Sequence, residues 1–482
     1  MSNYPSKTWC TYPFSSLVLH HGGTYGPCCT ANEMVGTNIN DEEVVLKMHD
    51  LNEKACFEPY AMTADEAFHS EFMKDIRQQM MDGKKPTACS DCWDWECVGL
   101  KSKRQGMNEF YIQPNSGQHP NNGEFDYDID EMVKNPRLRS LDLKFNNKCN
   151  LHCLMCSSGS SDMWVPLDIK MHNYLALQNV TKEQDLDLYI DDSHRQSWVP
   201  EEFPESLFEE IKSLVPQLQE IQCTGGEPFI NVHFIELLKY IIDTGHAEHI
   251  SLEVTTNGTK FVTEVMELLT HFRHIRMLIS VDGTNETYDY IRAPYSYDLL
   301  LKRLKVLDEY FVSGRIKGWT EISAVAMSYN MFDFQNLSTI VEDLKYEEFR
   351  VDGNINFSLH NMDNPLHIKW LPDSLINEAM NYYKSLLHKS YPLRHTPSAT
   401  WAFFTSQGIE RFEFEEQHLS HIITKFEGYI KNNQVDKETK LCNQRRMKNY
   451  TVLMDKTLNR DYHDYLDSRI CKFLDTIDTD VK

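Results

Sequence analysis

The stretch CNLHCLMC, residues 149–156, follows directly on LDLKF, residues 141–145, in which apolar and polar side chains alternate as in a strand. Its three cysteines, Cys149, Cys153 and Cys156, have C-x3-C-x2-C spacing. Three thiolates this close together can hold iron–sulfur or zinc, but they supply one ligand fewer than a closed four-coordinate site needs. An iron without a protein ligand can bind another molecule, so this loop is the first candidate functional site.

The bulk composition is that of an ordinary soluble globular protein. The 482 residues are 41% hydrophobic and 25% charged, and the length allows two or three domains. No apolar run is long enough to cross a membrane and residues 1–7 lack the apolar core of a signal peptide, so a cytoplasmic location is expected. The formal net charge, 48 minus 72 or −24, would repel phosphate backbones, so neither a nucleic-acid partner nor a membrane is expected.

Thirteen cysteines in a chain without an export signal indicate metal ligation or catalysis rather than a disulfide framework. Seven of them lie in residues 1–113. A strand over 14–20 and a turn at Gly22-Gly23 would return Cys28 close to Cys10, and Cys89 and Cys92 form a C-x2-C pair. These four thiols would make a closed site, with Cys29 as an alternative to Cys28. From this region alone, zinc and iron–sulfur are equally good interpretations, ahead of a ligand-free cluster of core cysteines.

The rest of the chain divides by pattern. Turn formers and acidic residues over 114–137 indicate a linker, and residues 371–482 have a polar, mainly helical pattern. Between them, residues 138–370 alternate strands with amphipathic helices, which predicts an α/β fold with parallel strands. Six strands are too few for a complete eight-stranded barrel, and 162–205 reads as an insertion. The expected strands are 139–145, 218–223, 250–256, 275–281, 318–327 and 348–358; the expected helices are 65–81, 231–244, 260–271, 296–312 and 332–344.

Ligands bind at the carboxyl ends of parallel strands, and the predicted strand ends carry unusual residues. Two glycines would let the backbone approach a ligand, and the glutamate after them could bind an ammonium group. The ends of the next two predicted strands offer hydroxyl and amide groups, and an arginine that could pair with a carboxylate follows the second of them. Each feature alone is more often a turn or a cap; four on successive strands are better explained as one site. The residues are Gly225, Gly226 and Glu227, then Thr256 and Asn257, then Ser280, then Arg292.

Together these motifs resemble the radical S-adenosylmethionine (SAM) superfamily. The resemblance implies a partial (β/α)6 barrel in which Cys149, Cys153 and Cys156 hold three irons of a [4Fe–4S] cluster whose fourth iron binds SAM. It implies that the Gly-Gly-Glu motif binds the SAM amine and that Thr256, Asn257, Ser280 and Arg292 contact the ribose and carboxylate. The residue before the last cysteine, usually aromatic beside the adenine, is Met155 here, which keeps an apolar contact.

The N-terminal cysteines are similar to the auxiliary-cluster domains called SPASM and Twitch. Cys10, twelve residues, Gly23, four residues and Cys28 match their opening, and Cys89 and Cys92 match their later pair. This implies a second [4Fe–4S] cluster on Cys10, Cys28, Cys89 and Cys92 in a small α+β domain over 1–113. Such domains usually follow the barrel, whereas this one precedes it, and Twitch fits better than SPASM because Cys97 departs from the SPASM spacing.

A second cluster without an open iron is expected to accept an electron from the substrate radical. The leading hypothesis is therefore a radical SAM oxidoreductase that modifies a peptide or protein oxidatively, with an electron donor such as flavodoxin or ferredoxin. The alternatives are oxidation of a small molecule such as a sugar or nucleoside, or a non-catalytic metal-cluster-binding interaction protein. No catalytic side chain is assigned.

Overall fold

A computed structural model describes most of the chain. It covers residues 4–38, 40–47, 58, 60–97, 102–112, 128–177, 203–346, 349–351, 364–387, 423–424, 426–427, 435–479 and 481. Parts of the predicted segments lie outside these residues: 114–127 of the linker, 178–202 of the insertion, 352–358 of the last strand and 388–422 of the C-terminal region.

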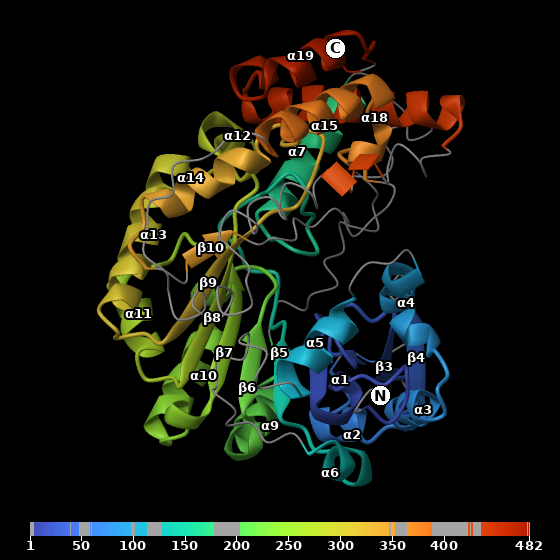
Figure 1. Cartoon of the computed structure of the whole chain (residues 1–482), viewed down its shortest axis with the longest axis vertical. Coiled ribbons are helices and arrows are strands. Elements are labelled where there is room, and N and C mark those ends of the chain that lie inside the picture. The colour runs from blue at the N-terminus through green and yellow to red at the C-terminus, as the bar shows by residue number, and fades with distance from the viewer. Residues whose placement is uncertain are drawn as a thin grey trace.

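One sheet runs through the molecule (Figure 1). It has ten strands in the order β10-β9-β8-β7-β6-β5-β1-β2-β3-β4. Strand β1 and strands β5 to β10 pair in parallel, whereas β2, β3 and β4 add as antiparallel neighbours. The strands are β1 Ser16–Leu19, β2 Tyr25–Gly26, β3 Glu33–Thr37, β4 Glu43–Lys47, β5 Ser140–Leu143, β6 Glu220–Cys223, β7 Ser251–Thr256, β8 His274–Ser280, β9 Gly318–Ser323 and β10 Phe349–Val351.

The six predicted barrel strands are confirmed as β5 to β10, each within a few residues of its expected position where it is described. They are joined by helices on one side of the sheet, which is the (β/α) arrangement expected from the alternating pattern. The helices are α9 Glu205–Leu214, α10 Val232–Asp243, α11 Thr263–Leu269, α12 Asn285–Ile291, α13 Tyr297–Val312 and α14 Leu337–Glu342.

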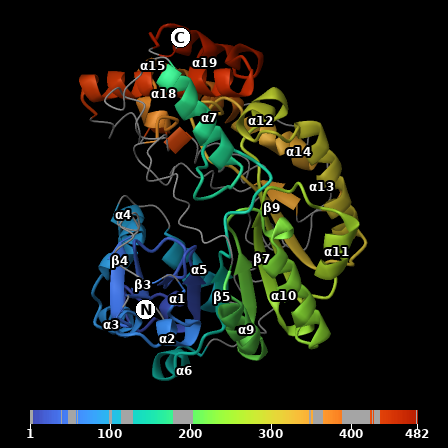
Figure 2. The same cartoon turned by 180° about the vertical axis from the view of Figure 1, so that it is seen from behind.

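The sequence does not predict that β1, from the N-terminal cysteine-rich region, extends the barrel sheet. Its residues Ser16 to Leu19 pair in parallel with Ser140 to Leu143 of β5. The expected hairpin is present, because β2 returns antiparallel to β1 after a turn in which Gly22 and Gly23 have positive φ. The cysteine-rich region therefore lies directly beside the first barrel strand (Figure 2).

The two faces of the sheet differ in polarity. Leu141, Ile221, Leu252 and Ile275 form one in-register row and are all buried in the core. The adjacent row faces the opposite way and is polar: it consists of Asp142, Gln222, Glu253, Arg276 and Trp319. Because strand side chains alternate between faces, the second row gives the barrel sheet a polar face opposite the apolar one.

Helices complete the N-terminal region. The expected helix over 65–81 is interrupted at Ser70, whose side chain caps the second of two helices. The helices are α1 Tyr12–Ser15, α2 Ala64–Phe68, α3 Glu71–Met81, α4 Ser90–Cys97 and α5 Lys103–Ile112, and α6 Ile129–Lys134 lies within the predicted linker.

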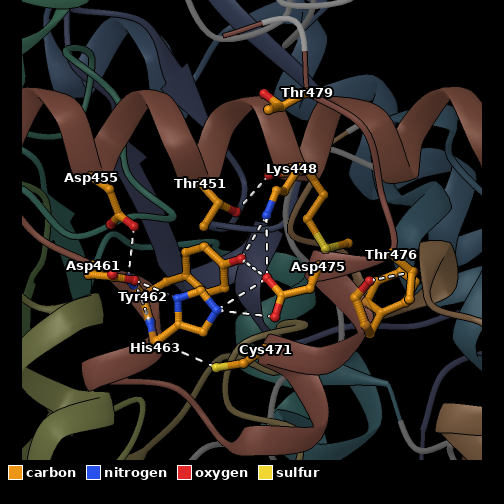
Figure 3. A network of polar contacts seen from close by, with 12 residues as sticks. Lys448, Thr451, Asp455, Asp461, Tyr462, His463, Cys471, Asp475, Thr476 and Thr479 are labelled. Carbon is orange, nitrogen blue, oxygen red and sulfur yellow. Dashed lines mark hydrogen bonds and ion pairs between the residues drawn. The ribbon is translucent and has the colours of Figure 1, made fainter. Parts of the chain in front are cut away.

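The C-terminal region is helical where it is described, with α15 Asp373–Leu387, α18 Lys437–Leu458 and α19 Ser468–Asp475. It packs near α7 Trp164–Leu177, which follows the cysteine loop. Polar contacts join α18, α19 and the segment between them (Figure 3). Lys448 of α18 donates to the Tyr462 hydroxyl at 2.7 Å. In the segment between the helices, His463 contacts Asp461 at 2.6 Å and Asp475 of α19 at 3.1 Å. None of the helices in the described ranges combines the length and the apolar character that a membrane span requires.

Candidate functional site

The three-cysteine loop, residues 149–156, leaves the carboxyl end of β5 and is held by backbone hydrogen bonds. The amides of His152 and Leu154 donate to the carbonyls of Ala293 (2.8 Å) and Ile291 (2.9 Å), at the end of α12 and just after it. From the other side, the hydroxyl of Tyr450 on α18 donates to the Leu154 carbonyl at 2.9 Å. The C-terminal region therefore contributes directly to the position of this loop, which the sequence did not indicate.

The Gly-Gly-Glu turn after β6 is pressed against the three-cysteine loop. Gly225 and Gly226 both have positive φ, and a Cβ on Gly226 would lie 2.2 Å from the carbonyl oxygen of Lys148. The amide of Glu227 donates to that same carbonyl at 2.8 Å. On the far side, a Cβ on Gly225 would lie 2.8 Å from the His21 ring. Only glycine fits at both positions, as expected for a close approach of two backbones.

Glu227 is completely buried and joins two strand ends. Its carboxylate accepts hydrogen bonds from the Thr256 hydroxyl (2.7 Å) and from the amides of Asn257 (2.7 Å) and Phe229 (3.2 Å). Burial raises the pKa of Glu227, and these three donors oppose that shift. The structure thus gives the Glu227 side chain a positioning role; its predicted binding of an amine stays a prediction.

Asn257 connects the end of β7 to the cysteines. Its side-chain Nδ2 lies 3.0 Å from the Asn150 oxygen and 3.8 Å from the Cys149 sulfur. Its Oδ1 accepts from the amide and hydroxyl of Thr259 at 3.0 and 2.7 Å, which fixes the orientation of the amide group. The predicted Thr256-Asn257 pair is therefore brought to the three-cysteine loop, with an N–H donor directed at a sulfur.

Arg292 lies at the end of α12 in a buried ion pair. Its guanidinium donates to the Asp282 carboxylate at 2.6 Å, and its Nη1 lies 3.8 Å from the Cys153 sulfur. The other Asp282 oxygen accepts from the Val325 amide at 2.7 Å. The sequence predicted Arg292 but missed Asp282, although its position just after β8 was a usable signal. Asp282 sets the direction of the arginine beside the cysteines.

The remaining predicted barrel residues lie at the same end of the sheet. Ser280 is the last residue of β8 and is half-buried. Met155 is half-buried and packs against the core. Burial raises the pKa of the Cys149 thiol to about 11. Because metal ligands must be deprotonated, binding of a metal centre by this loop would release protons.

The four N-terminal cysteines of the predicted set line one cavity. Cys10 lies just before α1, Cys28 just after β2, Cys89 in a short turn before α4, and Cys92 in α4. The rest of the lining comes mainly from α1 and α5 and is Tyr12, Pro13, Pro27, Thr30, Met80, Lys103 and Arg104. The four cysteines come from three separate stretches of the chain, so the fold and not the spacing alone brings them together. We call this group the four-cysteine cavity.

Of the thiols that line the four-cysteine cavity, those of Cys10 and Cys92 are buried and those of Cys28 and Cys89 are half-buried. Burial, followed by the neighbouring Cys28, raises the pKa of Cys10, and burial raises the pKa of Cys28 to about 11. Burial also raises the pKa of Cys92, and the Arg104 backbone and the Ser102 side chain oppose that shift.

Cys29 is placed differently from Cys28. It does not line the cavity, and its sulfur accepts a hydrogen bond from the Lys103 ammonium at 2.7 Å. The structure thus favours Cys28 over Cys29 as the member of the predicted set. Cys97 is exposed, and its thiol donates to the Asp94 carbonyl at 3.0 Å. Cys223 is buried in a row with Leu143 and Val254, as expected for a core residue.

Both groups of cysteines offer thiols, the donors that iron–sulfur clusters and structural zinc sites share. In the part of the chain that the structure describes, which includes all seven of these cysteines, no three His, Cys, Asp or Glu side chains are arranged to hold one metal ion.

Comparison with proteins of known sequence finds relatives over part of the chain. Mycofactocin maturase MftC of Mycobacterium tuberculosis is 28% identical over 137 residues, which is 27% of this chain and 33% of that protein. The Mycolicibacterium smegmatis protein of the same name is 30% identical over 105 residues, 20% of this chain and 26% of its own. The match therefore spans about a third of the length of these relatives or less.

Solved structures resemble the chain only weakly. Streptococcus suis SuiB bound to S-adenosylmethionine has a TM-score of 0.33 and 13% identity, over 74% of this chain and 69% of that one. Native anSMEcpe with bound AdoMet has a TM-score of 0.31 and 14% identity, over 70% of this chain and 100% of that one. At these TM-scores the likeness carries no further conclusion.

A family model gives the most specific match. Residues 143–338 match the model described as the radical SAM superfamily. This range begins at the end of β5 and contains the three-cysteine loop, the Gly-Gly-Glu turn, the Thr256-Asn257 pair and the Asp282–Arg292 ion pair. The similarity to the radical SAM superfamily is therefore carried by residues 143–338.

Proposed function

We propose that this protein is a radical SAM oxidoreductase that modifies a peptide or protein oxidatively. The observation that carries the proposal is the convergence of three strand ends on the three-cysteine loop, with Asn257 and Arg292 directed at two of its sulfurs. When bound there, a [4Fe–4S] cluster supplies the electron that cleaves SAM to methionine and a 5′-deoxyadenosyl radical, which takes a hydrogen atom from the substrate.

The residues of the chain have separate tasks in this proposal. Cys149, Cys153 and Cys156 would hold three irons and leave the fourth open for SAM. Glu227 fixes the Asn257 backbone, so that the Asn257 side chain stays beside Cys149. Asp282 holds Arg292 in the same way beside Cys153. Ser280 and Met155, at the rim of this end of the sheet, are the proposed contacts to the ribose and the adenine.

The oxidative outcome depends on the four-cysteine cavity. Cys10, Cys28, Cys89 and Cys92 would bind all four irons of a second cluster, leaving no iron open to substrate. Such a group suits an electron acceptor better than a substrate-binding centre. Tyr12 and Pro13 of the cavity lining belong to α1, which leads directly into β1, and β1 pairs with β5 of the barrel sheet. An electron donor such as flavodoxin or ferredoxin is proposed for the first cluster.

A peptide or protein substrate is supported by the names of the sequence relatives, which are maturases. The match covers only about a third of their length at most, so the substrate class is a proposal and not a transfer of their activity. A small-molecule substrate remains the alternative, and the structure gives no separate observation in its favour.

The test is SAM cleavage by the full chain after anaerobic reconstitution with iron and sulfide. Under dithionite, the wild-type protein should release 5′-deoxyadenosine and contain about eight irons, the sum of two [4Fe–4S] clusters. Cys156→Ala should abolish the release and lower the iron content to about four. The exposed Cys97→Ala is the matched control and should leave both unchanged.

Release of 5′-deoxyadenosine by Cys156→Ala at the wild-type rate, or none by the wild-type protein, would contradict the radical reaction. The substrate class is tested by mass spectrometry of peptides co-produced with the enzyme. A peptide that loses the mass of two hydrogens only when SAM cleavage is intact supports the proposal. The same loss on a sugar or nucleoside, and on no peptide, would overturn the substrate class.

A further inference from the structure

The wall of the four-cysteine cavity contains two cations that differ in their surroundings. Arg104 is paired with Glu96, to which it donates at 3.0 Å from Nε and 2.8 Å from Nη2. Its Nη1 donates to the Trp9 carbonyl at 2.7 Å. The Glu96 carboxylate therefore balances the charge of Arg104, and this pair adds little net charge to the cavity.

Lys103, the other cation, has no such partner. Its ammonium donates to the Cys29 sulfur at 2.7 Å and lies over the Tyr12 ring, 5.4 Å from the centroid. Within the described part of the chain, it forms no ion pair with a carboxylate, and Glu253 on β7 acts on it more weakly than Cys29 and Tyr12 do. Lys103 is thus the cavity cation whose charge is not balanced by a neighbouring carboxylate.

The place of Lys103 is fixed by three parts of the fold. It begins α5, it lines the cavity together with Cys28, and its ammonium reaches from there to Cys29 and over the Tyr12 ring of α1. The side chain therefore lies in the wall of the four-cysteine cavity, between α1 and the segment after β2. A charge at this point acts on whatever the cavity holds.

We propose that Lys103 is a tuning residue that raises the reduction potential of the group bound in the four-cysteine cavity. The inference rests on the proposed function, because it takes that group to be a [4Fe–4S] cluster. Four thiolates give such a cluster a net negative charge, and reduction adds another in a buried place. A nearby ammonium stabilises the more negative state, and net charge is one of the main determinants of cluster potential.

This makes the two cysteine groups unequal as electron acceptors. Arg292, beside the three-cysteine loop, is paired with a buried carboxylate, whereas Lys103, in the wall of the four-cysteine cavity, forms no ion pair with a carboxylate among the described residues. The second group is therefore the better acceptor, which fits an oxidative reaction.

The experiment uses the full chain with Cys149, Cys153 and Cys156 changed to alanine, so that only the N-terminal group is titrated. Its midpoint potential is measured by dye-mediated reduction, followed by electron paramagnetic resonance, with and without Lys103→Met. At a fixed potential, Lys103→Met should lower the ratio of reduced to oxidised cluster about tenfold, a shift of about 59 mV for one electron.

Two controls separate charge from structure. Lys103→Arg keeps the charge and should keep the midpoint. Lys85→Met removes a charge from the same region, at an exposed residue over the Trp93 ring that does not line the cavity, and should also keep it. Iron and sulfide per chain should be equal in all four proteins.

An intact cluster with the same midpoint in Lys103→Met as in its parent would overturn this inference and leave the proposed function standing. A parent protein without iron and sulfide would overturn the auxiliary cluster itself, and the inference with it. An equal shift in Lys103→Arg would also overturn the role of charge.

Discussion

The three-cysteine loop and the four-cysteine cavity both gather cysteine side chains, but in different numbers and surroundings. The loop has three thiols at the carboxyl end of a parallel sheet, and the donors facing them are Asn257, just after β7, and Arg292, at the end of α12. The cavity has four thiols from three separate stretches of the N-terminal region, with Lys103 and Arg104 in its wall. Under the proposed function, the first group shares an iron with a further ligand and the second binds a complete cluster.

The two groups of cysteines also differ in how the charges around them are balanced. At the loop, a buried carboxylate, Asp282, balances Arg292. At the cavity, Lys103 contacts a thiol and an aromatic ring and has no carboxylate partner among the described residues. Charge balance, as well as ligand number, thus distinguishes the two groups.

The largest expected effect comes from removing one thiol of each group in turn. Cys153→Ala should abolish release of 5′-deoxyadenosine, because the iron that binds SAM is lost with its cluster. Cys92→Ala should keep that release and lose product formation, because only the electron acceptor is removed. Both are read by chromatography of the nucleoside and mass spectrometry of the product.

If Cys92→Ala loses 5′-deoxyadenosine release as completely as Cys153→Ala does, the two groups do not have separate roles. Circular dichroism of both variants checks that the comparison is between folded proteins.

The next prediction distinguishes Cys28 from its neighbour Cys29 by the iron content of their variants. Cys28→Ser should lower the iron content by about four, whereas Cys29→Ser should leave it unchanged. The reason is that Cys28 lines the cavity and Cys29 faces Lys103 instead. Iron and sulfide analysis of the two serine variants, reconstituted side by side, gives the answer. The opposite result would assign the ligand to Cys29.

A smaller effect is expected from breaking the ion pair beside the loop. Arg292→Met leaves the Asp282 carboxylate buried without its partner, which should lower the free energy of unfolding by about 3–5 kcal/mol. The double change Arg292→Met with Asp282→Asn should cost less, because no unpaired charge is left and the introduced amide oxygen can still accept from the Val325 amide. Denaturant titration of the single and double variants measures the difference; equal losses would mean that the pair is not coupled.

The smallest effect concerns Asp142, on the polar face between the two groups. Its side chain is 7% exposed, its Oδ1 has no hydrogen-bond partner in the structure, and burial raises the pKa of this carboxyl. A raised pKa in the folded state means that stability is greatest below the ordinary value near 3.8 and is lost as pH rises through the folded value.

Asp142→Asn should therefore raise the free energy of unfolding at about pH 7 by about 1 kcal/mol, with the gain disappearing toward about pH 4. Denaturant titrations across this pH range measure it. Asp75→Asn, at an exposed residue of α3, is the matched control and should change stability little at any pH. A gain that does not depend on pH would show that ionisation of Asp142 is not its cause.

Much of the fold and part of the site follow from local patterns. The six barrel strands lie where alternating and apolar runs predict them, because a strand buried on one side or both needs such a run. Two parts of the site are also explained by local sequence. A short loop brings the thiols of Cys149, Cys153 and Cys156 together. In the Gly-Gly-Glu turn, only glycine fits against the Lys148 carbonyl.

Contacts between distant segments did not follow from such patterns. The pairing of β1 with β5, the bond from Tyr450 to Leu154 and the partnership of Asp282 with Arg292 each depend on where two remote residues meet. Local propensity contains no information about that meeting, which is set by packing of the whole core.

The two groups of cysteines show the same division. For the three-cysteine loop, the sequence by itself was enough to group the three candidate ligands, because all three thiols lie within eight residues of one loop. For the four-cysteine cavity, the sequence left Cys28 and Cys29 as alternatives. Only the tertiary structure decided that Cys28 lines the cavity and that Lys103, which contacts Cys29 and no carboxylate among the described residues, stands beside it, because their neighbours come from stretches of chain far apart in the sequence.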